Sequence, residues 1–145
     1  MRVTVLNGPN LNLLGQREPA VYGSTTFAEL EAMVQTEASA LGIALTWYQS
    51  NHEGVLVDAI QGLPSSADAL ILNAGALTHT SLAIRDALLA VQVPFIEVHL
   101  SNPLARDPVR HHSMTADLAV GLIAGLGPAG YRLALQGLHE RFRGA

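Results

Sequence analysis

Glu97 and His99 are two residues apart in an apolar stretch that predicts a buried strand. Side chains at positions i and i+2 of a strand project from the same face, so the two groups are expected to meet. A carboxylate bound to one imidazole nitrogen fixes the tautomer of the ring and leaves the other nitrogen to deliver a proton. The pair therefore predicts a general acid, His99, oriented by Glu97. A structural histidine bound to backbone at a strand end fits this short motif equally well.

A second candidate pair, Arg17 and Tyr22, lies in the segment of residues 7–25. A tyrosine phenol has a pKa of about 10, so it is a weak base at neutral pH unless a cation stabilises the phenolate. Arg17 is such a cation, because a guanidinium keeps its proton. In a closed site the pair predicts a general base. For an arbitrary arginine and tyrosine, a solvated arginine and a ring packed on the core are the favoured alternative.

Three apolar runs of the chain each end at a polar cluster: Asn7-Gly8-Pro9-Asn10, Asn73-Ala74-Gly75 and Glu97-Val98-His99. The carboxyl ends of parallel strands share one edge of a sheet, and ligands bind in the crevice outside it. We therefore expect the clusters to converge on one pocket. The backbone N–H groups of Leu100 and Ser101 could hold an anion there. Residues 78–81 add an imidazole and hydroxyls, although Thr80 or Ser81 also fits ordinary helix capping.

The hydrophobic periodicity predicts strands that alternate with helices. Strands are expected at residues 2–6, 43–48, 69–72, 93–98 and 118–124. Helices are expected after the capping-box patterns at Thr26 and Ser50, after Thr80 or Ser81, and over about 128–143. This alternation is typical of an α/β fold, and right-handed crossovers leave few topologies. The simplest is a flavodoxin-like three-layer sandwich with a five-stranded parallel sheet in the order 2-1-3-4-5.

The connection over residues 7–25 is long for a strand-to-helix loop, because such loops usually take about 2–6 residues. Gly8, Gly15 and Gly23 give it the backbone freedom that a closing segment needs. We expect one domain over residues 1–145, with a lid near residues 16–24. A disordered insertion with a buried tyrosine is the alternative.

Composition excludes several kinds of chemistry. The chain has no cysteine, which excludes thiolate nucleophiles and cysteine-based metal sites, and all eight basic side chains are arginine. Without lysine, no side-chain amine can form a Schiff base. The adjacent residues His111 and His112 point apart, so we expect no metal site there. Nucleotide-binding glycine motifs are absent, and we expect no cofactor. Arg110 could clamp a carboxylate or hydroxylated ligand, or it could be a solvated surface residue.

Charge and hydropathy narrow the partners. The net charge of −4 argues against nucleic acid, and no apolar run reaches the roughly 20 residues that cross a bilayer. A small-molecule ligand is therefore expected. The first residues lack the pattern of a secretory signal, which predicts a cytoplasmic location. Because 49% of the residues are hydrophobic, we expect sister subunits to cover part of the surface.

Four segments together carry a family resemblance: residues 7–23, Asn73-Ala74-Gly75-Ala76-Leu77-Thr78-His79-Thr80-Ser81, Glu97-Val98-His99-Leu100-Ser101-Asn102 and Arg110-His111-His112-Ser113. In this order they closely resemble type II 3-dehydroquinate dehydratase. The resemblance implies an anti elimination of water from 3-dehydroquinate to 3-dehydroshikimate, through an enolate and without metal or cofactor. It places the reaction in the shikimate pathway of aromatic amino acid biosynthesis or in quinate breakdown.

The resemblance also implies residue roles. Tyr22 would take the proton from carbon 2, Arg17 would favour its phenolate, and Asn10 would help hold a water at the enolate oxygen. His99, oriented by Glu97, would protonate the departing hydroxyl. The residues implied to bind substrate are Asn73, His79, Leu100, Ser101, Arg110 and, from a neighbouring subunit, Asp86. The implied assembly is a homododecamer, a tetramer of trimers.

Two other function classes fit parts of the sequence. A metal-free hydrolase could use Ser101 and His99, but i and i+2 neighbours on one strand rarely allow the approach that a nucleophile and its base require. A flavin-binding or anion-binding module would fit the fold, since a fold does not fix a function. Neither class accounts for the long segment that carries Arg17 and Tyr22.

Overall fold

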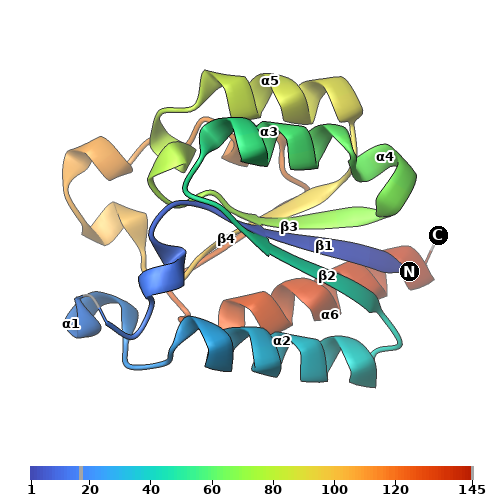
Figure 1. Ribbon diagram of the computed structural model, residues 1–145, viewed down its shortest axis with the longest axis horizontal. Coiled ribbons are helices and arrows are strands. Elements are labelled where there is room, and N and C mark those ends of the chain that lie inside the picture. The colour runs from blue at the N-terminus through green and yellow to red at the C-terminus, as the bar shows by residue number, and fades with distance from the viewer. Residues whose placement is uncertain (17, 145) are drawn as a thin grey trace.

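The computed structural model describes residues 1–16 and 18–144, and of Tyr22 the backbone alone. Five parallel strands form one sheet in the order β2-β1-β3-β4-β5, with helices on both faces (Figure 1). The strands are β1 (Arg2–Asn7), β2 (Ala44–Gln49), β3 (Ala69–Asn73), β4 (Phe95–His99) and β5 (Gly121–Ala124). The predicted α/β flavodoxin-like class and its strand order are confirmed.

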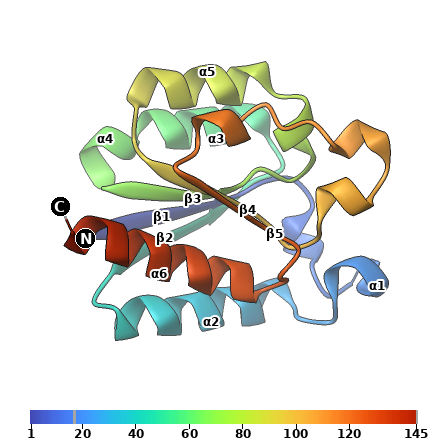
Figure 2. The same ribbon diagram turned by 180° about the vertical axis from the view of Figure 1, so that it is seen from behind.

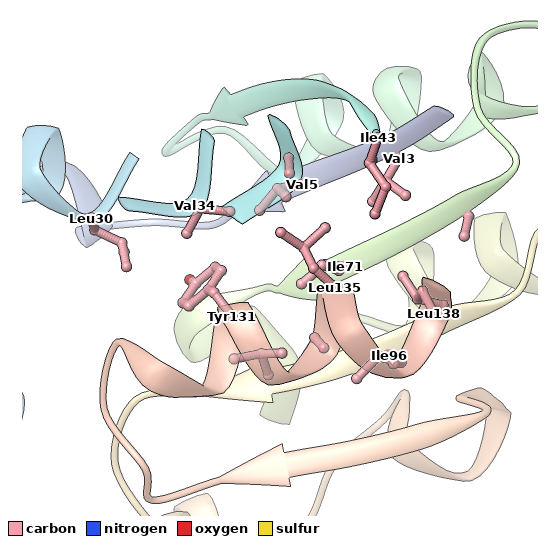
Figure 3. Close-up of a cluster of buried hydrophobic side chains, with 14 of the residues drawn as sticks. Val3, Val5, Leu30, Val34, Ile43, Ile71, Ile96, Tyr131, Leu135 and Leu138 are labelled. Carbon is pink, nitrogen blue, oxygen red and sulfur yellow. The ribbon is translucent and has the colours of Figure 1, made fainter. Parts of the chain in front are cut away.

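Two long helices cover each face of the sheet (Figures 1 and 2). On one side lie α2 (Phe27–Ala40) and α6 (Ala129–Arg143), and on the other α3 (Glu53–Gln61), the short α4 (Leu63–Ser66) and α5 (Leu82–Val91). Neighbouring residues of β1 enter different cores, because Val5 packs in the α2 and α6 layer and Leu6 in the α3 and α5 layer. Figure 3 shows the first layer, where Leu135 of α6 faces the sheet. Burial on both faces explains the continuous apolar run of β3, in which every residue is buried.

Three of the four helix starts expected from the sequence agree with the structure: those after Thr26, after Ser81 and near residue 128. The Thr26 hydroxyl accepts a hydrogen bond from the Glu29 N–H at 3.1 Å, and the Ser81 hydroxyl caps α5 through the Ile84 N–H at 2.9 Å. The capping box expected at Ser50 is wrong. There the Ser50 N–H, which a capping box would give to the Glu53 side chain, donates instead to the carbonyl of Asn7 at 3.0 Å, and α3 starts only at Glu53, with His52 as its N-cap.

The last strand is shorter than the apolar run 118–124 predicts. Its first residue is Gly121, because Leu118 belongs to a 3-10 turn, η5 (Ala116–Leu118), closed by a hydrogen bond from the Leu118 N–H to the Thr115 carbonyl at 3.0 Å. The strand expected at 93–98 likewise starts at Phe95, after Pro94, which has no N–H for the ladder. Both differences are shifts of an end, and the sheet order is unaffected.

The segment of residues 7–25 contains two short helical pieces, η1 (Leu11–Leu13) and α1 (Pro19–Tyr22). Its start is fixed against β3, since the Gly8 N–H donates to the carbonyl of Asn73 at 2.7 Å. A Cβ atom on Gly8 would lie 2.2 Å from the Ala74 carbonyl oxygen, so only glycine permits this approach. The predicted lid at 16–24 stays a prediction, and Arg17 lies outside the described residues.

Over the described part of the chain, no helix is long and apolar enough to cross a membrane.

Candidate active site

A pocket lies where β1, β3 and β4 end, at the carboxyl edge of the sheet. Asn7 and Asn73 are register partners at the ends of β1 and β3, and β4 continues the same edge. The predicted site residues that line the pocket are Asn10, Asn73, His79, His99, Leu100, Ser101 and Arg110. The sheet thus brings together segments that are far apart in sequence, as expected from the three polar clusters.

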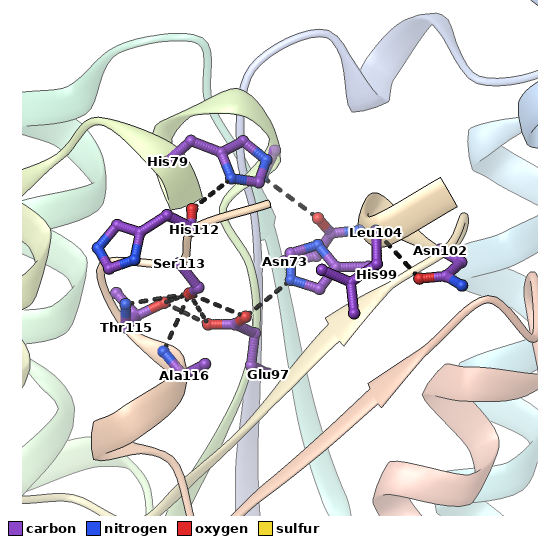
Figure 4. Close-up of polar contacts among 11 residues, drawn as sticks. Asn73, His79, Glu97, His99, Asn102, Leu104, His112, Ser113, Thr115 and Ala116 are labelled. Atoms are coloured by element: carbon purple, nitrogen blue, oxygen red, sulfur yellow. Dashed lines mark hydrogen bonds and ion pairs between the residues drawn. The ribbon is translucent and has the colours of Figure 1, made fainter. Parts of the chain in front are cut away.

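Glu97 and His99 meet on one face of β4 (Figure 4). The Glu97 Oε2 atom lies 2.8 Å from His99 Nε2, and both side chains are buried, with 1% and 9% of their surface exposed. Because Nε2 faces the carboxylate, Nδ1 is the ring nitrogen left for the pocket. The i, i+2 spacing therefore predicts the contact correctly, whereas the role of His99 as an acid stays a prediction.

The ring of His79 stacks beside that of His99, with centroids 6.4 Å apart and planes inclined by 17°. His79 Nδ1 lies 2.8 Å from the carbonyl oxygen of His112. A carbonyl only accepts, so Nδ1 carries the proton and Nε2 is left as an acceptor. His79 can thus accept a hydrogen bond from a ligand hydroxyl.

Two hydroxyls that were not predicted from the sequence hold the carboxylate of Glu97 on the side opposite His99 (Figure 4). Ser113 Oγ lies 3.0 and 3.1 Å from the two carboxylate oxygens, and Thr115 Oγ1 donates to Oε1. Burial raises the pKa of Glu97, but hydrogen bonds from His99, Thr115 and Ser113 outweigh burial, and the pKa lies below its ordinary value. Glu97 is therefore ionised at neutral pH.

Asn73, which lines the pocket, belongs to a buried network around Tyr131 of α6. The Tyr131 hydroxyl donates to Asn7 Oδ1 at 2.7 Å and accepts from Asn73 Nδ2 at 2.9 Å. Asn7 Nδ2 in turn donates to the Tyr48 carbonyl at 3.1 Å, and Asn73 Oδ1 accepts from the Gly75 N–H at 3.2 Å. Complete burial raises the pKa of Tyr131, so its hydroxyl stays protonated. The network fixes the amide of Asn73 in one orientation and leaves one of its N–H groups for a ligand.

Two arginines add positive charge to the pocket. Arg110 is held by Asp107, with its Nε 3.1 Å from Oδ1, and Arg106 lies 3.7 Å from Glu18 Oε2. The Ser101 hydroxyl accepts from Arg106 Nη1 at 3.5 Å. No hydrogen bond joins Ser101 to His99 in the described part of the chain, and a hydrolase that uses this pair lacks its central contact. The arrangement fits an anionic, hydroxylated ligand.

The sequence profile of the family described as "Dehydroquinase class II" matches residues 1–139. The chain belongs to this family. It is 53% identical over 141 residues to a catabolic 3-dehydroquinase of Aspergillus oryzae, and the aligned residues cover 97% of this chain and 92% of the relative. It is also 53% identical over 143 residues to a 3-dehydroquinate dehydratase of Parasynechococcus marenigrum, and the aligned residues cover 99% of this chain and 98% of that relative.

Solved structures of type II dehydroquinases have the same fold. That from Propionibacterium acnes superposes with a TM-score of 0.91 at 40% identity and covers 96% of each chain. That from Butyrivibrio crossotus gives a TM-score of 0.93 at 43% identity, over 95% of this chain and 97% of the other. The family predicted from the four sequence motifs is confirmed.

The dehydroquinase resemblance assigns three further residues to the site, and their roles stay predictions. Asp86 is exposed on α5 and does not line the pocket. Arg17 and the side chain of Tyr22 lie outside the described residues. The backbone of α1 nevertheless borders the site, because Val21 and Gly23 line a hollow together with Ser101 and Arg106.

Proposed function

We propose that this protein eliminates water from 3-dehydroquinate to give 3-dehydroshikimate, as a type II 3-dehydroquinate dehydratase of the hydro-lyase class. The observation that carries the proposal is the buried Glu97 and His99 pair at a pocket edge, in a chain that belongs to the dehydroquinase family. The pair supplies a general acid with one nitrogen held and one nitrogen free, which an elimination of hydroxide requires.

The proposed reaction uses a separate base and acid. Tyr22, kept as a phenolate by Arg17, removes the proton from carbon 2, next to the carbonyl. The electron pair of that C–H bond forms an enolate, and a water held by Asn10 stabilises its oxygen. The enolate then expels the hydroxyl β to the carbonyl, and His99, protonated on both ring nitrogens at this step, gives that hydroxyl its Nδ1 proton while Nε2–H stays bound to Glu97. Water leaves, and the proton on Tyr22 returns to His99 through solvent.

Substrate binding is assigned to the polar groups around the pocket. The free N–H of Asn73 and the backbone N–H groups of Leu100 and Ser101 are suited to carboxylate or hydroxyl oxygens. His79 Nε2 and the Arg110 guanidinium complete the set. Relatives named as catabolic enzymes are as similar to this chain as relatives without that word. We place the reaction in the shikimate pathway of aromatic amino acid biosynthesis, with quinate breakdown as the alternative.

Purified protein mixed with 3-dehydroquinate is expected to produce the ultraviolet absorbance of a conjugated enone. The rate is expected to be unchanged by a metal chelator and by borohydride, because neither a metal nor an imine takes part. Loss of activity with chelator, or irreversible inactivation by borohydride with substrate, contradicts the mechanism. Absence of product contradicts the function itself.

We further propose assembly as a homododecamer, a tetramer of trimers, in which Asp86 reaches a neighbouring subunit's pocket. Large apolar side chains are exposed near the β5 edge, with Leu104 67% and Leu122 54% exposed. A surface of this kind is suited to burial against a sister subunit. The cytoplasmic location, the lack of a cofactor, and the lack of nucleic-acid or membrane partners stay predictions.

Asp86→Ala tests the shared site. Light scattering is expected to report a dodecamer for both proteins, with KM raised about tenfold in the variant because a hydrogen bond accepted by the charged Asp86 carboxylate is lost. Asp58→Ala, at an acidic position on α3 outside the pocket, is the control and is expected to keep the wild-type KM. A fully active monomer would rule out the shared site.

A further inference from the structure

A pair of hydroxyls lies on the side of Glu97 away from His99 (Figure 4). We call Ser113 and Thr115 the hydroxyl clamp. Ser113 Oγ lies within 3.1 Å of both oxygens of the Glu97 carboxylate, and Thr115 Oγ1 donates to Oε1 (Figure 4). Thr115 has no exposed surface, so solvent cannot replace its hydroxyl. None of the proposed chemical steps uses either residue directly.

The direction of the hydroxyl protons follows from a count of donors and acceptors. Ser113 Oγ accepts from the Thr115 N–H at 3.1 Å and from the Ala116 N–H at 3.0 Å, which occupies both of its lone pairs. Its single proton is left for Glu97. The Thr115 hydroxyl faces an ionised oxygen, which only accepts, so Thr115 also donates. Both protons of the hydroxyl clamp point at the carboxylate.

A carboxylate that already receives two O–H donors is held ionised and offers His99 an acceptor only. His99 Nε2, at 2.8 Å from Oε2, must therefore carry a proton, and Nδ1 faces the pocket. We propose that Ser113 and Thr115 are positioning residues that act through Glu97: they keep the Nε2–H of His99 on the carboxylate, so that Nδ1 is the nitrogen that takes up the second proton of the imidazolium and gives it to the ligand. The identity of the reaction that Nδ1 serves rests on the proposed function.

The hydroxyl clamp has its own rigid support. The Met114 N–H donates to the Thr78 carbonyl at 2.8 Å, and the Met114 carbonyl accepts from Arg85 Nη1 at 2.9 Å. Arg85 also contacts both carboxylate oxygens of Asp117, at 2.6 and 3.0 Å. These bonds fix residues 113–117 to α5 and to η2 (Gly75–His79). A fixed turn can hold Glu97 and His99 in a single geometry, which proton transfer requires.

Thr115→Val removes the hydroxyl and keeps the branched shape, whereas Thr115→Ser keeps the hydroxyl. For Thr115→Val we expect kcat to fall about tenfold with KM unchanged, since one hydrogen bond to a charged group is lost and no substrate contact changes. Thr115→Ser is expected to restore kcat to within about twofold. Ser113→Ala is less suitable, because it also removes the acceptor of two backbone N–H groups of the turn.

A nitrogen-15 NMR spectrum of protein with labelled histidine measures the tautomer of His99 directly and does not depend on enzyme activity. In the wild type, neutral His99 is expected in the Nε2–H form, and Thr115→Val is expected to mix in the Nδ1–H form. If wild-type protein shows no turnover with 3-dehydroquinate but this spectrum is as expected, the proposed function is wrong, whereas the positioning of His99 by Ser113 and Thr115 is supported. If turnover is present and Thr115→Val keeps both kcat and the wild-type spectrum, the inference is overturned.

The pH profile gives a third readout. Fewer donors raise the pKa of Glu97, so the acidic limb of kcat is expected to move to higher pH in Thr115→Val and to return in Thr115→Ser. Among the described residues, several other ionisable groups line the two hollows beside this pair, and all are retained in both variants: His79, Arg85, Arg106, Arg110, His111, His112 and Asp117. A loss of kcat that Thr115→Ser does not reverse, with an unmoved limb, marks a merely structural residue and contradicts the proposal.

Discussion

His99→Gln is expected to lower turnover by roughly 10²–10⁴-fold while the fold and the affinity for substrate stay close to those of the wild type. The amide of glutamine can still hydrogen-bond to Glu97, but it cannot transfer a proton at neutral pH. The measurement is the rate of enone formation with circular dichroism as the check on folding. His52→Gln, at an exposed histidine before α3 with no side-chain cap bond, is the matched control.

The same variant separates the acid from the base. Proton removal from carbon 2 precedes loss of the hydroxyl, so His99→Gln is expected to retain exchange of that hydrogen with deuterated solvent, although product no longer forms. A variant that loses exchange together with turnover would show that His99 acts before the enolate, contrary to the proposed sequence of steps.

Tyr22→Phe is expected to lower turnover by a similar factor, roughly 10²–10⁴-fold, and to abolish the exchange as well. The change removes only the phenol oxygen, which is the proposed base. The backbone of α1 borders the same wall of the site as Ser101 and Arg106, which places Tyr22 within a segment suited to reach the ligand. Tyr48→Phe is the control, since Tyr48 is 52% exposed on β2. Wild-type turnover in Tyr22→Phe would exclude this base.

The sheet could be predicted because its strands are short apolar runs separated by helices, two of which have clear caps, at Thr26 and Ser81. Val5 and Leu6 illustrate the signal, since adjacent apolar residues of one strand enter two different cores. The ends of the strands and helices were harder to predict. Ser50 has the sequence of a helix cap, yet its N–H completes the ladder with Asn7, and a tertiary hydrogen bond of this kind has no local signature.

The contacts of the site likewise include some that could be predicted from local spacing and others that depend on the tertiary fold. Glu97 and His99 could be paired from sequence because strand geometry alone places i and i+2 side chains together. Thr115 lies 18 positions from Glu97, and Tyr131 lies 58 positions from Asn73, so these contacts depend on how loops and helices return to the sheet. The pattern Ser-x-Thr at 113–115, typical of a turn in which a hydroxyl binds backbone N–H groups, was the one local signal available for the hydroxyl clamp.

The hydroxyl of Tyr131 bridges Asn7 and Asn73, and the first of these contacts joins residues 124 positions apart. Ribosomes build a chain from its N-terminus, so the two asparagines are made long before the helix that satisfies them. Until that helix docks, Asn7 Oδ1 and one N–H of the Asn73 amide lack their Tyr131 partner, which is costly once they are buried. The network of Asn7, Asn73 and Tyr131 is therefore among the last parts of the molecule to form. We expect the protein to become active only after the final helix has been synthesised.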